Sequence, residues 1–254
     1  MLITKSGNLQ NVNFGERSQI KSKIKIIEFL QKEHVGRFTT IDKNGFPFTV
    51  PMNFVHHNNV IYIHGFPKGE KYENIKINSK CGFEVDREIT FLPSYFFDPP
   101  TDASLTDTLY VSVIIKGCAE LVTDNLEKSD VLNALMEKHQ NEGGYESLKP
   151  EMATVRGVGV IKIKPEMMTG KYKLGKYWDA KDKFRIATRI MERALKDPRR
   201  ALTILNIPGL EKLDNKTTKK IAWIHSSEII DMMGFKNTLE YPEISLMVVE
   251  DIDW

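Results

Sequence analysis

The spacing of apolar residues changes from a helical to a strand period near residue 33. In residues 19–32, isoleucines recur every three or four positions among lysines and glutamates, which is typical of an amphipathic helix. Residues 35–65 are instead rich in β-branched and aromatic side chains and contain two turn signals. We therefore expect one helix followed by three antiparallel strands.

The turn signals are Asn44-Gly45 and the Asn-Asn pair at residues 58–59. Asparagine and glycine adopt the positive φ angles that tight hairpin turns need. Between the two turns, Pro47 and Pro51 each lack the N–H group that a ladder of hydrogen bonds uses. The sequence therefore predicts bulges or irregular pairing in the second strand.

The pattern continues with further strands and few helices. We expect, in chain order, a short helix at residues 69–77, a strand at 81–86, a long loop at 90–107, a strand at 108–122, a helix after Asp124 and a strand at 158–164 that ends at Pro165. Gly117 is a candidate bulge, and Asp124 and Glu127 have capping-box spacing. These elements predict a mainly β fold, a six-stranded antiparallel barrel with flanking helices, because closure hides the sheet edges.

The charge pattern changes beyond about residue 178. Residues 179–222 hold 12 Lys and Arg against 6 Asp and Glu, and residues 223–254 hold one Lys against seven acids. The two segments can neutralise each other. We expect a barrel domain at residues 1–178 and an α/β extension at 179–254, with a strand at 246–249 and an exposed helical face of Arg185, Arg189 and Arg193 that pairs with the acidic end.

Composition narrows the class of protein. The 254 residues are 41% hydrophobic and 28% charged, with a net charge of +2, so a globular core is expected and a chain-wide field for nucleic acid is not. Two cysteines without motif spacing support neither a disulfide scaffold nor a zinc ribbon. No apolar run approaches the ~18 residues that span a bilayer. We expect a soluble, cytoplasmic protein without a metal site.

Lys68 and Lys71 are candidates for chemistry because they stand one turn apart where the short helix is expected to begin. Cations at a helix start oppose the helix dipole unless an anion binds there, and free backbone N–H groups at that end also bind anions. A phosphate site is therefore one interpretation. A solvated lysine-rich helix face is the other.

Three ordered segments carry a family resemblance: IDKNGFPFTVPMNFVHHNNVIYIHGFPKGEKYENIK, YVSVIIKGCAELV and VIKIKPEMMTGK. Over about residues 29–171 the chain resembles the FMN-binding split-barrel proteins related to pyridoxamine 5′-phosphate oxidase, in particular the nitroimidazole-resistance branch. The resemblance implies a split barrel, an FMN cofactor and a homodimer that binds the flavin between its subunits.

The resemblance also implies a set of site residues. The backbone of residues 51–54 would follow the isoalloxazine edge, and the lysines with Asn74 would hold the phosphate. The implied cofactor-binding residues are Pro51, Met52, Asn53, Phe54, His64, Lys68, Lys71, Asn74, Tyr110, Ser112 and Val113. Family members often have arginine where this chain has Cys118, so that arginine's contact has no counterpart here. Residues 169–171 match the family's ending.

The implied function is flavin-dependent redox chemistry on a small organic molecule, of nitroimidazole or pyridoxamine-phosphate type. The cofactor supplies that chemistry, so we predict no catalytic triad, and His64 is the one catalytic candidate. The alternatives are a non-enzymatic flavin module for electron transfer, a haem-binding split barrel with His64 on the iron, and nucleic-acid binding by the basic extension.

Several other residues have ordinary structural interpretations. His56 and His57 precede a turn and would point to opposite faces of a strand, which favours turn residues over metal ligands. Cys81 and Cys118 are expected as small buried residues in strands. Trp178 is expected to anchor the extension, with a role beside the flavin as the alternative.

Overall fold

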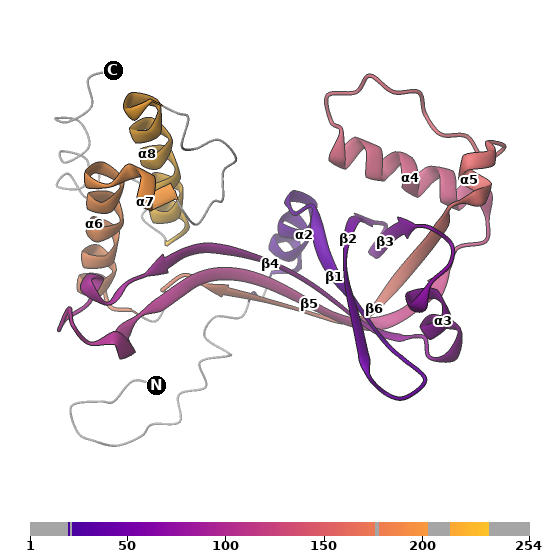
Figure 1. The fold of residues 1–254 in the computed structure, drawn as a ribbon, viewed down its shortest axis with the longest axis horizontal. Coiled ribbons are helices and arrows are strands. Elements are labelled where there is room, and N and C mark those ends of the chain that lie inside the picture. The colour runs from indigo at the N-terminus through magenta and orange to yellow at the C-terminus, as the bar shows by residue number, and fades with distance from the viewer. Residues whose placement is uncertain (1–19, 21, 176–177, 203–213, 234–254) are drawn as a thin grey trace. The chain divides into compact units, whose positions relative to one another are not determined.

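The computed structural model describes residues 20, 22–175, 178–202 and 214–233, shown as coloured ribbon in Figure 1. The expected strand at 246–249 lies outside these residues. The elements are α2 (Lys23–Lys32), β1 (Val35–Ile41), β2 (Pro47–His57), β3 (Val60–Gly65), α3 (Glu70–Ile77), β4 (Lys80–Leu92), the 3-10 turns η1 (Ser94–Phe96) and η2 (Ala103–Leu105), β5 (Asp107–Leu121), α4 (Asn125–His139), α5 (Ala153–Gly157), β6 (Gly159–Lys173), α6 (Ala180–Lys196), α7 (Pro198–Leu202) and α8 (Asn215–Met232).

Six strands form one antiparallel sheet in the order β1-β2-β3-β6-β5-β4. The sheet closes because β1 also pairs with β4, with Phe38 opposite Phe83. The result is a closed ring of strands rather than a regular barrel. The prediction of a mainly β, six-stranded split barrel with flanking helices is confirmed.

Both hairpin turns follow the predicted local chemistry. Gly45 has a φ of 87°, and the Asp42 side chain accepts hydrogen bonds from two backbone N–H groups of its turn. Asn58 and Asn59 adopt φ angles of 51° and 64°. Each turn thus provides the positive φ angles that join two antiparallel strands closely.

The predicted irregularity at Pro47 and Pro51 is wrong. The β1–β2 register runs without interruption from Val35 opposite Asn53 to Ile41 opposite Pro47. β3 pairs with β2 only from Phe54 onward. A proline is tolerated where its missing N–H faces the unpaired side of a strand, and both prolines lie in such a stretch.

Two strands are longer than predicted. β4 continues to Leu92, so it takes up the start of the expected loop at 90–107, and β6 continues through Pro165 to Lys173. β5 runs unbroken through Gly117. A Cβ on Gly117 would collide with the backbone of Lys164 on the neighbouring strand, so glycine is needed here for close approach rather than for a bulge.

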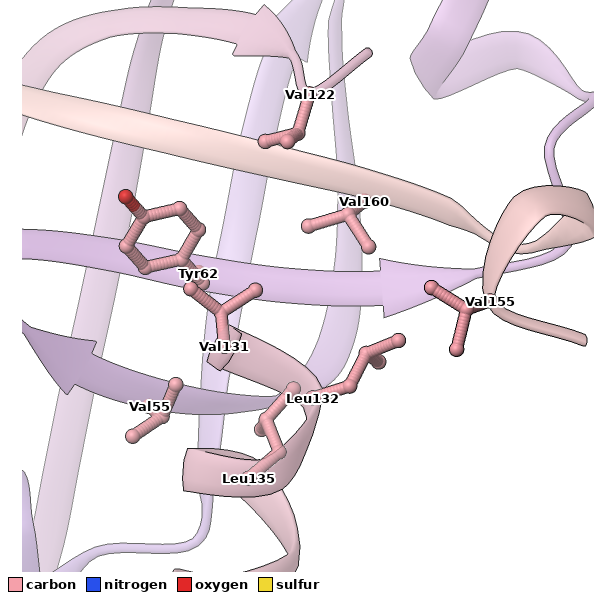
Figure 2. Packing of buried hydrophobic residues seen from close by; sticks show 8 residues of the cluster. All are labelled: Val55, Tyr62, Val122, Val131, Leu132, Leu135, Val155 and Val160. Carbon is pink, nitrogen blue, oxygen red and sulfur yellow. The ribbon is translucent and has the colours of Figure 1, made fainter. Parts of the chain in front are cut away.

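Helix α4 packs on the outside of the sheet. Figure 2 shows its apolar side chains against residues of β2, β3 and β6; the cluster is Val55, Tyr62, Val122, Val131, Leu132, Leu135, Val155 and Val160. Asp124 caps the helix as predicted and accepts from the Leu126 N–H. Glu127 instead accepts from the Tyr62 hydroxyl at 3.0 Å and contacts Lys162.

The chain divides into two compact units that alternate along the sequence. We call the described residues of 19–87 and 112–172 the barrel unit, and the described residues of 88–111 and 173–233 the C-terminal unit. The predicted boundary after residue 178 stays a prediction. No helix among the described residues is long and apolar enough to cross a membrane.

In the C-terminal unit, α6 packs with α7 and α8. The expected arginine face is not wholly exposed: Arg193 donates to the Thr90 hydroxyl at 2.9 Å and to the Phe91 carbonyl at 3.2 Å. Arg185 and Arg189 form ion pairs with acidic residues on their own helix. Trp178 stacks edge-on to Phe97, as an anchoring residue would, with 6.3 Å between ring centroids.

Candidate functional site

The start of α3 is open to an anion. Gly69 is its N-cap residue, at a φ of 113°, and provides no side-chain cap. The Tyr72 and Glu73 N–H groups donate to the Gly69 carbonyl, but no side chain of a described residue caps the turn before them. A Cβ on Gly69 would meet no heavy atom within 4 Å, so open space surrounds this helix end.

The charges at this end differ from the predicted excess of lysine. Glu70 and Glu73 lie in the first turn, where they favour the helix dipole. Lys68 is exposed and precedes the helix, so of the two candidate lysines only Lys71 belongs to it. The lysine-rich start is therefore a mixed segment in which Lys71 is the helical cation.

Two predicted site residues, Met52 and Lys71, converge at Gly65. A Cβ added to Gly65 would lie 3.8 Å from Lys71 Nζ and 3.8 Å from Met52 Cε. The glycine at the end of β3 thus leaves a gap between β2 and α3. Residues predicted from separate sequence motifs come together here.

Lys71 is available to a ligand. Its Nζ lies 4.8 Å from the centroid of the Tyr72 ring, and it has no ion-pair partner among the described residues. The Tyr72 ring is buried and packs beside Gly159, where a Cβ would collide with it. The packed ring supports the Lys71 side chain, and no acidic side chain of a described residue pairs with its ammonium group.

The first half of β2 presents alternate side chains to solvent. Thr49, Pro51 and Asn53 are exposed, whereas Met52 is half-buried and Phe54 is fully buried. Phe54 can therefore contact a ligand only through its backbone, as the resemblance implies. The exposed face gives a flat molecule access to the strand edge.

His64 reaches solvent at the end of β3, next to Gly65. Partial desolvation lowers the pKa of His64 below its ordinary value. The imidazole is therefore neutral at pH 7 and can both donate and accept a hydrogen bond.

The remaining predicted residues are dispersed. Asn74 is buried and donates to the Thr40 hydroxyl at 3.0 Å, a contact inside the barrel unit. Ser112 is half-buried on β5, and the Val113 side chain is fully buried, which leaves only its backbone for a ligand. Tyr110 is half-buried and belongs to the C-terminal unit.

The structural interpretations of other residues hold in part. His56 and His57 lie in β2 rather than in the turn, and His57 Nε2 is 3.2 Å from Asp130 Oδ2. Cys81 and Cys118 are half-buried, and burial raises the pKa of Cys81 to about 12, which keeps its thiol protonated. Among the described residues no group of three or more His, Cys, Asp or Glu could hold a metal.

Sequence reasoning missed a polar cluster at the end of α4. Lys138 Nζ donates to the carbonyls of Leu30 and Phe54, both at 3.0 Å, and His139 Nε2 lies 3.3 Å from the same Phe54 carbonyl. His34 Nδ1 lies 3.2 Å from His139 Nδ1. The sequence signal was a Lys-His pair in the last turn of a helix, where cations are favourable.

The sequence pattern of the pyridoxamine 5′-phosphate oxidase family matches residues 22–172. The chain belongs to this family. The match spans β1 to β5, all of β6 except its last residue, the start of α3 and the gap at Gly65. No curated protein matches the chain.

Solved structures share the fold at low identity. A Bacteroides thetaiotaomicron protein named for 5-nitroimidazole antibiotic resistance is 24% identical, with a TM-score of 0.50, over 60% of this chain and 85% of its own. The flavocytochrome Anf3 from Azotobacter vinelandii is 19% identical, with a TM-score of 0.53, over 67% and 77%. An FAD and haem binding protein from Mycobacterium smegmatis is 14% identical, with a TM-score of 0.52, over 65% and 78%.

The residues at Gly65 fit the phosphate end of a flavin. In the part of the chain that the structure describes, the start of α3 has no side-chain cap and the Lys71 ammonium group has no ion-pair partner, and glycine leaves a gap beside them. A terminal phosphate needs these features. The exposed edge of β2 offers backbone groups beside this gap. The arrangement can bind and orient a planar anionic cofactor, with His64 as the neighbouring proton-carrying side chain.

Proposed function

We propose that the protein binds FMN and reduces or oxidises a small organic molecule. The observation that carries the proposal is the convergence of Met52, Gly65 and Lys71 at the uncapped start of α3. Lys71 would hold the phosphate with the first backbone N–H groups of α3. Lys68, exposed just before the helix, would add a second, weaker charge contact.

The isoalloxazine ring would lie along residues 51–54 of β2. Pro51 and Asn53 are exposed on that strand, and Phe54 contributes its backbone. Two of the solved structures that share the fold are named for flavin and one is named for nitroimidazole resistance, which supports redox chemistry of this type. The bound flavin would supply the electron transfer, so the protein residues bind, orient and limit access.

His64 is the candidate for proton transfer in this proposal. Its neutral imidazole stands at the end of β3, beside the glycine of the phosphate gap. Near pH 7 the neutral imidazole can accept a proton from a substrate that is being oxidised and release it to water. His64→Gln should lower turnover and alter its pH dependence while FMN remains bound.

We propose that two subunits share each flavin. The outer face of β1 and β2 is open, with Val35 45% exposed opposite Asn53. Ser112 lies half-buried on β5, the strand that the resemblance places at the subunit interface. Ser112→Trp should therefore release FMN and dissociate the dimer together. Loss of FMN from an intact dimer would count against a shared site.

Rapid mixing under anaerobic conditions tests the enzymatic part. We expect NADH or NADPH to bleach the flavin absorbance, and a nitroimidazole to restore it over repeated turnovers. Reduction without any turnover of nitroaromatic acceptors would favour a non-enzymatic electron-transfer module.

Haem binding is the second candidate, because the neutral form of His64 is the form that ligates iron. Haem titration would then give a Soret band that disappears in His64→Ala. An unchanged band in that variant would remove His64 as an iron ligand.

A further inference from the structure

The backbone carbonyl of Phe54 stands where the β1–β2 ladder ends. The last residues paired in that ladder are Val35 and Asn53, so Phe54 lies one residue beyond it. Its carbonyl accepts a hydrogen bond from Lys138 Nζ at 3.0 Å and lies 3.3 Å from His139 Nε2. Side chains of α4 therefore bind a carbonyl of β2 that lies beyond the last residue paired with β1.

The same ammonium group joins three elements of the barrel unit. Lys138 Nζ also donates to the Leu30 carbonyl near the end of α2, at 3.0 Å. It lies 3.6 Å from the centroid of the Phe54 ring, on which a cation is favoured. Lys138 thus fixes both the carbonyl and the ring of Phe54.

The contacts of His139 and His34 define which ring nitrogens donate and which accept. A carbonyl only accepts, so His139 must donate from Nε2 to Phe54. The Nδ1 atom of neutral His139 is then an acceptor, and the proton between the rings belongs to His34 Nδ1. The pair orients His139 toward the strand.

Lys138 is held by polar contacts with backbone groups of α2 and β2. Burial lowers the pKa of Lys138 to about 8, so the fold keeps the ammonium where its charge is disfavoured. Well-packed apolar side chains often stabilise a buried position as well as charged ones do. An apolar side chain at this position could not donate a hydrogen bond to the Phe54 carbonyl, and so could not fix its position.

We propose that Lys138 and His139 are positioning residues, which hold the Phe54 carbonyl and thereby fix the strand segment 51–54 against the flavin edge. The inference rests on the proposed function, because it concerns the segment along which the flavin would lie. Neither side chain is proposed to touch the cofactor.

Lys128 provides a matched control on the same helix. It is 8% exposed, and its Nζ donates to the carbonyls of Arg156 at 3.3 Å and Val158 at 3.0 Å. Lys128 is therefore a second lysine of α4 that binds two backbone carbonyls. None of the residues it binds belongs to the proposed flavin site.

The test compares Lys138→Met with Lys128→Met by equilibrium FMN titration and by the visible spectrum of the bound flavin. We expect Lys138→Met to weaken FMN binding about tenfold, or ~1.4 kcal/mol, and to shift the absorption bands. Lys128→Met should keep the wild-type affinity and spectrum. Equal affinity and identical spectra in the two variants would overturn the inference.

A pair of substitutions at His139 keeps the test decisive if Lys138→Met does not fold. Gln retains an N–H donor and should preserve the wild-type spectrum, whereas Leu removes it and should reproduce the Lys138→Met shift. Amide hydrogen exchange of residues 53–55 in flavin-free protein should be faster in His139→Leu than in His139→Gln. Equal exchange and equal spectra would contradict a positioning role.

The outcomes separate the inference from the proposed function. A wild-type protein that binds no FMN would end both. If none of these substitutions changes FMN binding, only the proposed role of Lys138 and His139 is contradicted.

Discussion

The barrel unit and the three C-terminal helices fill their cores with different side chains. Inside the barrel unit, Phe38, Phe54 and Phe83 are almost fully buried, and the last two meet edge-on with 5.2 Å between ring centroids. Helices α6, α7 and α8 bury aliphatic residues such as Ile186 and Ile190. They also share a cluster of small side chains, Ala194, Ala201 and Ala222, around Leu202. Aromatic rings fill the volume inside a ring of strands, whereas alanines let helices approach closely.

This difference predicts opposite sensitivities. The barrel unit should lose most from the removal of volume, and the helices from the addition of volume. The family match ends at residue 172, before α6 begins at Ala180. The site residues at Gly65 all belong to the barrel unit, so damage to the helices should leave FMN affinity intact.

Phe38→Ala should have the largest effect. It removes a fully buried ring that pairs in register with Phe83 across β1 and β4, and should cost about 3–5 kcal/mol of unfolding free energy. Chemical denaturation measures the cost. Phe46→Ala, which truncates a side chain that is 69% exposed, should stay within about 0.5 kcal/mol of wild type. Similar losses in both variants would contradict the description of the core.

Lys71→Ala should act on binding rather than on stability. Loss of a charge-assisted hydrogen bond should weaken FMN binding by about 1.5–3 kcal/mol, with little change in thermal unfolding of flavin-free protein. Isothermal titration measures the affinity. Lys76→Ala, on the same helix but paired with Glu73 at 2.8 Å, is the control and should bind FMN normally.

Ala194→Leu should overpack the helices and cost about 1–3 kcal/mol in the C-terminal unit without weakening FMN binding. Ala180→Leu places the same side chain at an exposed position of α6 and should be nearly neutral. Thermal unfolding followed by circular dichroism, together with FMN titration, gives both readouts. Weaker FMN binding in Ala194→Leu would show that the helices support the site.

The smallest expected effect is a pH dependence. Burial lowers the folded-state pKa of Lys138 to about 8, below the ~10.4 of an unfolded chain. Between these values the unfolded state binds more protons, so the contribution of Lys138 to unfolding free energy rises with pH across this window. Tyr62 and Cys81, with pKa values raised to about 12, act in the opposite direction.

A comparison with Lys138→Met isolates the lysine from those two groups. Denaturation at pH 7.5 and about pH 10 should show that the wild type gains stability relative to the variant as the pH rises. A constant difference between the two proteins would mean that Lys138 titrates normally.

The sequence predicted the elements that depend on neighbouring residues. The positive φ angles at Gly45 and at Asn58-Asn59 are local preferences, so both hairpins followed from them. The continuation of β6 through Pro165 could not be predicted in this way, because it depends on β5, which lies close to β6 at Gly117. Local pattern therefore predicted the strands but not their lengths.

The same distinction applies to the site. The resemblance named Met52 and Lys71 as site residues, and the structure shows that the two side chains meet beside Gly65. The hydrogen bonds of Lys138 and His139 to Phe54 join residues 84 and 85 positions apart. No local pattern predicts a contact over that separation.

Parallel titration of FMN and riboflavin into flavin-free protein tests the phosphate site most directly, because the two molecules differ only by the phosphate. The account predicts that wild type binds FMN more tightly than riboflavin, and that Lys71→Ala abolishes most of that preference. Equal affinities in the wild type, or a preference for FMN that survives in Lys71→Ala, would contradict it.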